Sequence, residues 1–343
     1  MALPHGYYNS PPAYMGFVGY FRLRNGNVVG NGVDSGSNYS HSNMIVRATS
    51  ADMNATQAVT KPDTVDSRYD KTIYQLGPKE IDGSLTFPAV YDRQSGASIV
   101  EALYRYAVTR NPQGLLSDFD VDVKYATSQS PPNQADFVYY SCVVNTWQFS
   151  VTQGDLVNQT VAIIGLTRDF TDLSTAIPAA DLTNTRAVVW ADARVELVGG
   201  RLSNPIGGQY VRSFEANINN NADRFYTLNK ELFAQAIAPT KRDVDGNLVL
   251  MGRHMDLAEL AWTNQNYCSE TTNVKFGFIT TGVSGDCASA FNITLPNCVF
   301  EIEEMSLSNE IFETTVNWHC LPAAGTGISD PLLSSLNSTT FSY

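Results

Sequence analysis

Two stretches of this chain decide the expected fold: WQFSVTQGDLVN at residues 147–158 and CVFEIEEMSLSN at residues 298–309. Apolar and polar side chains alternate at the start of both, around Phe149 in the first and Phe300 in the second. A period of two is typical of β-strands that bury one face. We therefore expect both stretches to begin as half-buried strands.

The same two stretches indicate an internal duplication. A constant offset of 151 residues superimposes them, and it also aligns VKYA at Val123 with VKFG at Val274. Two more segment pairs recur in the same order: VRATSADMN (46–54) with VRSFEANIN (211–219), and EIDGSLTF around Gly83 with VLMGRHMD around Gly252. Repeats that keep their order along a chain predict two related structural units.

The length of 343 residues suits two domains. Residues 171–185 have little strand character, and Pro178 interrupts regular pairing there. We place the boundary near Asp181. This gives a first β domain at 1–180, with an extended N-terminal arm and loop, and a second β domain at 181–343, with a C-terminal tail.

Most of the remaining secondary structure is also expected to be strand. The expected segments are 19–24, 45–51, 80–87, 121–126, 137–144, 188–198, 209–218 and 273–280. Composition agrees, because Asn, Thr, Ser, Tyr and Val favour strands and turns over surface helices.

One segment at residues 95–109, SGASIVEALYRYAVT, predicts an α-helix instead. Ser98 and Glu101 have capping-box spacing, and the apolar residues that follow share one helical face. Its counterpart in the second half is either LAELAW, after Asp256, or LNKELFAQAIA (228–238). The expected fold is mainly β, with two tandem, related antiparallel β-sandwich or barrel domains, each with about one packed helix.

Composition and motifs argue against catalysis and against tight nucleic-acid binding. The 22 basic and 34 acidic residues give a net charge of −12, so the chain lacks the electropositive footprint that binds phosphates. No GxSxG, P-loop or HExxH motif occurs, and the four histidines are scattered. We expect no enzymatic activity, no catalytic residues and no cofactor.

The five cysteines form no CxxC pair and have no zinc-site spacing. We predict neither a metal site nor a disulfide, and we expect buried free thiols. The sequence contains no run of about 18 apolar residues, so no membrane-spanning helix is predicted. The start of the chain lacks the pattern of a secretory signal, so synthesis in the cytoplasm is expected.

Acidic residues at every second position form the strongest candidate functional pattern. Asp118, Asp120 and Asp122 resemble the opening of a calcium loop, but the central glycine and closing glutamate of such a loop are missing. Apolar residues lie between them, which indicates a strand with one acidic face. This face is either simply solvated or lines an acidic channel, to which Glu301 and Glu303 contribute from the second half.

Three motifs together resemble those of phage tail tube proteins: VRSFEANINNN at Val211, a glycine-centred strand at Gly252, and a late strand that starts at Leu295, Pro296 and Asn297. The resemblance implies β units whose extended hairpins join those of neighbours into an inner barrel. It also implies stacked rings, of three chains with pseudo-sixfold symmetry or of six chains. DNA would pass through the lumen without specific binding, and no membrane is involved.

The same resemblance implies a protein of the virion tail, assembled in the host bacterial cytoplasm, whose other partners are tail proteins such as a sheath, baseplate or terminator protein. Two alternatives stay open. The first is another ring-forming tail component, such as a tube-initiating, terminator or distal tail protein. The second is a carbohydrate-binding β-sandwich that uses aromatic residues such as Tyr139, Tyr140 or Trp262.

Overall fold

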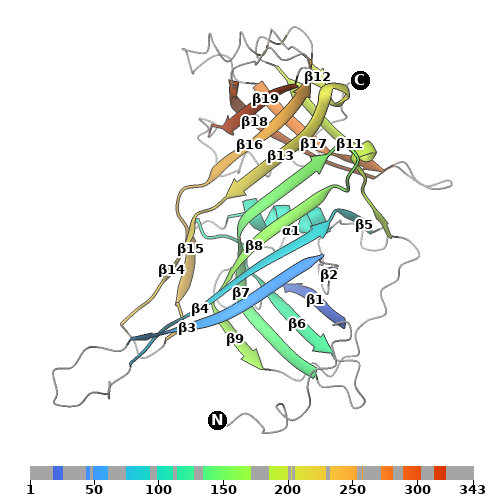
Figure 1. Cartoon of the computed structure of the whole chain (residues 1–343). Coiled ribbons are helices and arrows are strands. Elements are labelled where there is room, and N and C mark those ends of the chain that lie inside the picture. Colours follow the sequence, from blue (N-terminus) through green and yellow to red (C-terminus); the bar gives the residue numbers. More distant parts are fainter. Residues whose placement is uncertain are drawn as a thin grey trace, which may run out of the picture.

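The structure is a computed structural model, and strands dominate it (Figure 1). This confirms the expected mainly β fold with antiparallel sheets. The described residues are 18–25, 44–46, 49–60, 75–92, 99–110, 114–126, 134–170, 185–199, 202, 205–228, 232–252, 257, 272–280, 289–302 and 313–321.

The first half of the chain contributes nine strands and one helix to the described structure. They are β1 (Val18–Asn25), β2 (Met44–Val46), β3 (Ser50–Thr60), β4 (Gln75–Pro88), β5 (Val90–Asp92), α1 (Ile99–Val108), β6 (Phe119–Ala126), β7 (Gln134–Thr152), β8 (Asn158–Gly165) and β9 (Thr167–Phe170).

The second half contributes ten strands and two short 3₁₀ turns within the described ranges. They are β10 (Thr185–Ala187), η2 (Trp190–Asp192), β11 (Ala193–Val198), β12 (Ile206–Gly207), η3 (Gly208–Tyr210), β13 (Val211–Asn219), β14 (Ala222–Phe225), β15 (Ala236–Pro239), β16 (Asp243–Met251), β17 (Thr272–Thr280), β18 (Ser289–Ile302) and β19 (Glu313–Cys320).

Fifteen strands form one antiparallel sheet that runs through both halves, and two small sheets pair β5 with β10 and β14 with β15. Strand order within the large sheet repeats. The first half reads β3-β4-β8-β7-β6-β1-β2, and the second reads β13-β16-β19-β18-β17-β11-β12. This shared order supports the predicted duplication, which remains a prediction.

The ladders correct the register of the sequence repeats. Gly83 of β4 lies between Met53 and Ile163, and the glycine in the equivalent place is Gly246 of β16, between Ala216 and Trp318. The expected partner, Gly252, lies beyond the end of β16 with a φ of 93°. It is therefore a turn residue and not the centre of a strand.

The offset of 151 residues also fails as a structural register. Val123 pairs with Phe137, whereas Val274 pairs with Leu295, so the two ladders are displaced differently. Aligning the bulge between Phe119 and Val121 with the one between Thr272 and Val274 makes Cys142 equivalent to Cys298. The sequence repeats thus agree with the shared strand order of the two halves but do not give the registration of the strands.

The predicted helix is confirmed as α1, which packs against β7. In the second half, residue 257 is helical and the Leu257 side chain is buried, which favours LAELAW as the counterpart of α1. The alternative segment at 228–238 ends inside β15 and is not helical where it is described. The proposed boundary at Asp181 and Pro178 lie outside the described residues.

One aromatic core connects the two halves. Trp147 and Phe149 of β7 lie 6.4 and 5.2 Å, by ring centroids, from Phe276 of β17. Phe214 of β13 lies 5.0 Å from Phe276 and stacks on Trp318 of β19 at 6.1 Å and an interplanar angle of 9°. All five rings are buried, so the halves share a hydrophobic interior.

Candidate assembly interface

The joint between the halves is a strand pairing. The 19-residue strand β7 pairs with β6 and β9 along its first part, and with β8 and β13 along its second. Seven positions of β13, from Ser213 opposite Thr152 to Asn219 opposite Thr146, form the β7–β13 ladder. Figure 1 shows the two strands side by side where the halves meet.

A buried polar cluster fixes the end of this joint. The Asn220 side chain has no exposed surface, and its Nδ2 donates to the carbonyls of Ala107, at 2.8 Å, and Val144, at 3.0 Å. Arg242 Nε donates to Asn220 Oδ1 at 3.2 Å, and Arg242 Nη2 donates to the Val108 carbonyl at 2.7 Å. The last carbonyls of a helix have no hydrogen-bond donor within the helix. The Asn220 and Arg242 side chains of the second half supply donors to these carbonyls at the C-terminus of α1.

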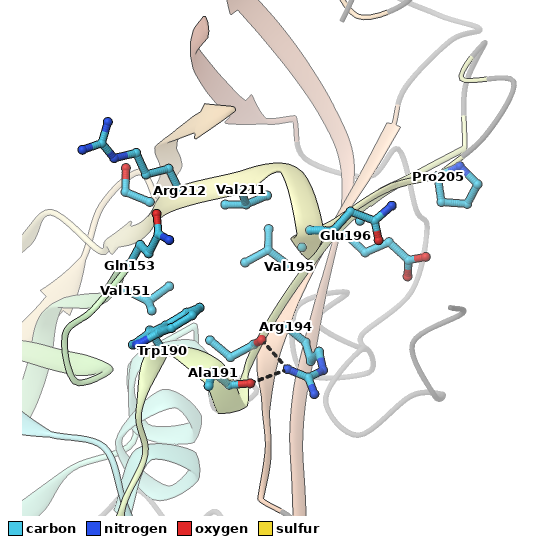
Figure 2. A pocket seen from close by; sticks show the side chains of 15 residues that line it. Val151, Gln153, Trp190, Ala191, Arg194, Val195, Glu196, Pro205, Val211 and Arg212 are labelled. Atoms are coloured by element: carbon cyan, nitrogen blue, oxygen red, sulfur yellow. Dashed lines mark hydrogen bonds between the residues drawn. The ribbon is translucent and has the colours of Figure 1, made fainter. Parts of the chain in front are cut away.

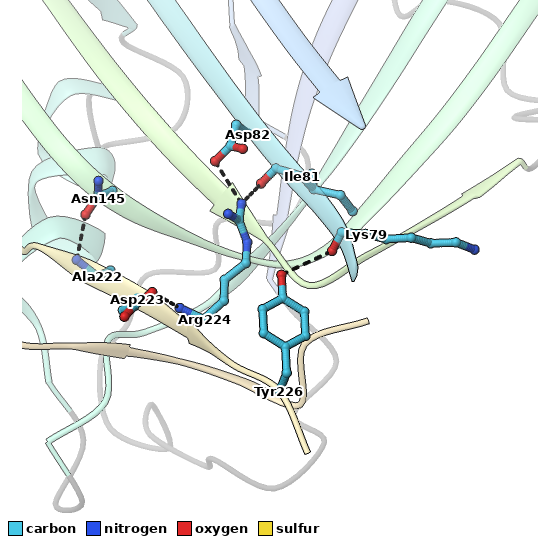
Figure 3. Close-up of polar contacts among 8 residues, drawn as sticks. All are labelled: Lys79, Ile81, Asp82, Asn145, Ala222, Asp223, Arg224 and Tyr226. Carbon is cyan, nitrogen blue, oxygen red and sulfur yellow. Dashed lines mark hydrogen bonds and ion pairs between the residues drawn. The ribbon is translucent and has the colours of Figure 1, made fainter. Parts of the chain in front are cut away.

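A second contact lies where the β14–β15 hairpin runs beside β4 (Figure 3). Arg224 pairs with Asp82 at 2.8 Å and also donates to the Ile81 carbonyl. Tyr226 Oη donates to the Lys79 carbonyl at 3.4 Å. Partial burial raises the pKa of the Tyr226 phenol, while the neighbouring Arg224 opposes this rise.

Open strand edges remain in both halves. Among the described strands, β3 pairs only with β4, and residues 299–302 of β18 pair only with β19. Their equivalents, β13 and the second part of β7, pair with each other in the joint. Unpaired backbone groups at a strand edge are a template for pairing with another chain.

The sheet surface opposite the aromatic core is polar and weakly charged. One row of directly opposed residues crosses six strands: Glu301, Asn317, Asn247, Glu215, Ser150 and Asn158. A second row crosses eight strands: Val299, His319, Asp245, Asn217, Gln148, Thr160, Thr86 and Ser50. Hydroxyl and amide groups with a few carboxylates therefore cover this face.

The predicted acidic residues do not all share one environment. Phe119, Val121 and Val123 are buried, as their alternation with the aspartates predicts. Asp120 is only 3% exposed, and its carboxylate accepts the backbone N–H of Ser141 at 3.1 Å. Ser141 has a φ of 49° at the bulge opposite, so Asp120 stabilises a strained turn of backbone within the chain.

The other acidic candidates are less enclosed where they are described. Asp118 is half-buried and Glu301 is exposed. The side chain of Asp122 and all of Glu303 lie outside the described residues. Sequence reasoning missed Glu215 and Asp245, which lie on the polar sheet face; the alternation in VRSFEANIN and DVDGNLVLM was the available signal.

A groove of about 560 Å³ lies beside the joint, between the end of β7, β11 and β13 (Figure 2). Trp190, 45% exposed, forms part of its wall, and Arg194 nearby donates to the carbonyls of Ala191 and Ala193. Of the aromatic residues considered for sugar binding, Tyr139 is buried and bonds to the Met53 carbonyl at 3.2 Å. It cannot stack on a ligand. Trp262 lies outside the described residues.

Histidine and other metal-ligating side chains are dispersed in the described part of the chain. Within those ranges, no three His, Cys, Asp or Glu side chains gather where they could hold a metal ion. His319 is exposed on the polar face, and the other three histidines lie outside the described residues. No helix among the described residues is long and apolar enough to cross a membrane.

These features define a structural β-sheet protein whose two halves associate through strand pairing. The profile of a family described as phage tail tube protein matches residues 32–282. The chain belongs to this family, which confirms the expected resemblance to phage tail tube proteins. Its role is that of a structural tail tube protein in the virion tail. No curated protein matched the chain.

Proposed function

We propose that the chain polymerises as stacked rings into the hollow tube through which genomic DNA leaves the virion. The tail tube family supports this function, and the net charge of −12 suits a surface along which DNA slides without adhering. The polar sheet face is the best candidate for the lumen wall. The observation that carries the proposal is the β7–β13 joint.

This joint serves as a template for the contact between chains. Within one chain, β13 of the second half pairs with β7 of the first. In a ring of such units, β3 of one chain pairs with β18 of the next in the same way. Among the described residues, β3 and the β18 positions Glu301 and Ile302, which are equivalent to Thr146 and Trp147, have the open edges with which this contact would begin.

Each chain then supplies two neighbouring units of the ring. Three chains complete a ring with pseudo-sixfold symmetry, and the joint between halves alternates with the joint between chains. A ring of six chains is the alternative. Mass separates the two, because one ring has the mass of three chains and the other that of six.

Negative-stain electron microscopy of the purified full-length protein over a concentration series, with light scattering for mass, tests the proposal. Rings or hollow tubes of uniform width are the expected result. A chain that stays monomeric both alone and with a tube-initiating tail protein contradicts it.

The template also predicts the register between chains. Because Asn220 N donates to the Asn145 carbonyl at 2.8 Å, the adjacent pair Asn219 and Thr146 is a non-hydrogen-bonded pair, in which side chains lie closest. The equivalent positions between chains are Thr56 and Glu301. A Thr56→Cys/Glu301→Cys variant is therefore expected to form disulfide-linked oligomers on oxidation of assembled rings, seen on non-reducing gels.

The matched control for this cross-link is Asp52→Cys/Glu301→Cys. Asp52 is exposed on the same face of β3 as Thr56. It lies four residues away, about 14 Å along the strand. Equal cross-linking of the two variants, or none in rings that do assemble, rules out this register and leaves the ring proposal to the microscopy.

The acidic residues are proposed to line the lumen and to repel DNA phosphates over about 8 Å at physiological salt. We expect virions with Asp118→Asn, Asp122→Asn, Glu301→Gln and Glu303→Gln to assemble normally but to release DNA more slowly. Glu215→Gln/Asp245→Asn forms a second set, which tests the polar face alone. Asp120 is left intact because it stabilises the bulge at Ser141.

DNA release measured by dye fluorescence after triggered ejection is the readout. If both variant sets release DNA at the wild-type rate, the proposal that these carboxylates repel DNA in the lumen is contradicted. Partners such as sheath, baseplate and terminator proteins, and assembly in the host cytoplasm, belong to the same proposal. Copy number per virion distinguishes a tube protein, present in many rings, from a tube-initiating, terminator or distal tail protein, present in one.

A further inference from the structure

Two cysteines oppose each other across adjacent strands of the second half. Cys298 of β18 and Cys320 of β19 are direct register partners. Leu321 N donates to the Asn297 carbonyl at 3.0 Å, so residues 297 and 321 are hydrogen-bonded partners and the cysteines form the adjacent non-hydrogen-bonded pair. Such pairs have Cα atoms about 4.5 Å apart. Disulfides span about 4.4–6.8 Å.

The two thiols also gather around one carbonyl. Cys320 Sγ lies 2.9 Å from the Pro296 oxygen, and Cys298 Sγ lies 3.9 Å from the same oxygen. Cys298 Sγ lies in addition 3.4 Å from the Leu295 oxygen. Both sulfur atoms therefore lie on the same side of the strand pair, as a bond between them requires.

The thiols differ in their access to solvent. Cys298 is fully buried, and burial, followed by the neighbouring Cys320, raises its pKa well above the ordinary value. Cys320 is partly exposed. Because the thiolate is the nucleophile, Cys320 is the thiol that reacts first with a reagent in solution.

We propose that Cys298 and Cys320 are a disulfide-forming pair that closes when the protein meets a small-molecule disulfide. The Cys320 thiolate attacks one sulfur of the reagent, forms a mixed disulfide and expels one thiolate. Cys298 then gives up its proton, and its sulfur attacks the Cys320 sulfur and expels the second thiolate. Two protein thiols are oxidised, and one disulfide is reduced to two small thiols.

The first half lacks this pair and serves as an internal comparison. Cys142 occupies the place of Cys298, but Gly165 occupies the place of Cys320. A Cβ built on Gly165 would lie 3.2 Å from Cys142 Sγ, which shows how closely the two places approach. Buried Cys142 has no such partner opposite it, so the bond is specific to the second half.

The test uses the full-length protein incubated with oxidised glutathione or with dithiothreitol, then denatured, alkylated and digested with a glutamate-specific protease. Cleavage after Glu301 and Glu313 places Cys298 and Cys320 on separate peptides. Oxidised protein is expected to give a linked pair of these peptides, which reduction separates. Cys287 shares a peptide with Cys298, so the Cys287→Ser variant is expected to keep the link and Cys320→Ser to lose it.

A stability readout accompanies the mapping. The disulfide closes a loop across two strands, so the melting temperature of oxidised protein is expected to rise by about 5 °C over reduced protein. Cys320→Ser, a small change at a partly exposed position, is expected to abolish the shift. Recovery of Cys320 as a stable glutathione adduct beside an alkylated Cys298 overturns the proposal, as does a link that is lost in Cys287→Ser, because Cys287 would then be the partner of Cys320.

Discussion

Gly246→Ala is expected to leave little folded protein, because the added methyl group has no room. Gly246 lies in the centre of the second-half sheet, with Ala216 opposite it on one side and Trp318 on the other. A Cβ there would lie 2.7 Å from Trp318 Cε2, and closer still to Trp318 Cζ2 and to the carbonyl oxygen of Glu215.

Neither the Glu215 carbonyl nor the Trp318 ring can move away from Gly246 without a large energetic cost. The Glu215 carbonyl belongs to the backbone of β13, and the Trp318 ring is buried and stacked on Phe214. Overpacking against such a rigid surface is expected to cost about 3 kcal/mol or more of the free energy of unfolding. Urea unfolding followed by Trp fluorescence, and the yield of soluble protein, measure the effect.

Two glycines provide matched controls. Gly83 occupies the equivalent place in the first half, but the nearest obstacle to its Cβ is the flexible end of Met53, so Gly83→Ala is expected to cost less. A Cβ on Gly207 would meet nothing nearer than Gln209 Oε1 at 3.5 Å, so Gly207→Ala is expected to stay within about 1 kcal/mol of wild type. Equal losses at Gly246 and Gly207 would contradict the steric argument.

Asn220→Ala is expected to destabilise the joint between the halves by roughly 3 kcal/mol. The change removes both donors that reach the Ala107 and Val144 carbonyls and leaves the Arg242 side chain without its Asn220 acceptor. Because these groups are buried, the protein cannot replace the lost bonds with water at no cost. Thermal and urea unfolding of the variant measure the loss.

Asn217→Ala is the control for Asn220. Asn217 lies on the same strand pairing, but it is only half-buried, and its single described side-chain bond, to Asp245, is long at 3.4 Å. A change of less than about 0.5 kcal/mol is expected there. If both variants unfold at the same temperature and the same urea concentration as wild type, the cluster at Asn220 does not hold the halves together.

The sequence predicted the kind of elements better than their extent. Alternation around Phe149 located β7, and the capping box at Ser98 and Glu101 located α1. The segments at 137–144 and 147–152 proved to be one strand, β7, which pairs with β6 up to Cys142 and with β13 from Thr146 and has a bulge near Asn145 in its ladder with β8. The alternation of apolar and polar side chains does not by itself reveal such a change of partner strand.

Registration was the main failure, and its cause is physical. Short apolar repeats match at several offsets of the same parity, so VRATSADMN could be aligned with VRSFEANIN, and EIDGSLTF with VLMGRHMD, without the ladder being right. Only pairing across strands identified Gly246 as the counterpart of Gly83. The candidate site suffered likewise, because the burial of Asp120 depends on Ser141, a residue on the neighbouring strand.

The length of β7 has a mechanical consequence. Its 19 residues span about 60 Å and touch four other strands. A pull along this strand loads the seven positions of the β7–β13 ladder in shear, all at once, whereas a pull across it would peel them apart one after another. The ladder therefore resists sliding of the two halves along β7 more strongly than it resists their separation across β7, so tension along the strand is the load that this joint is best built to carry.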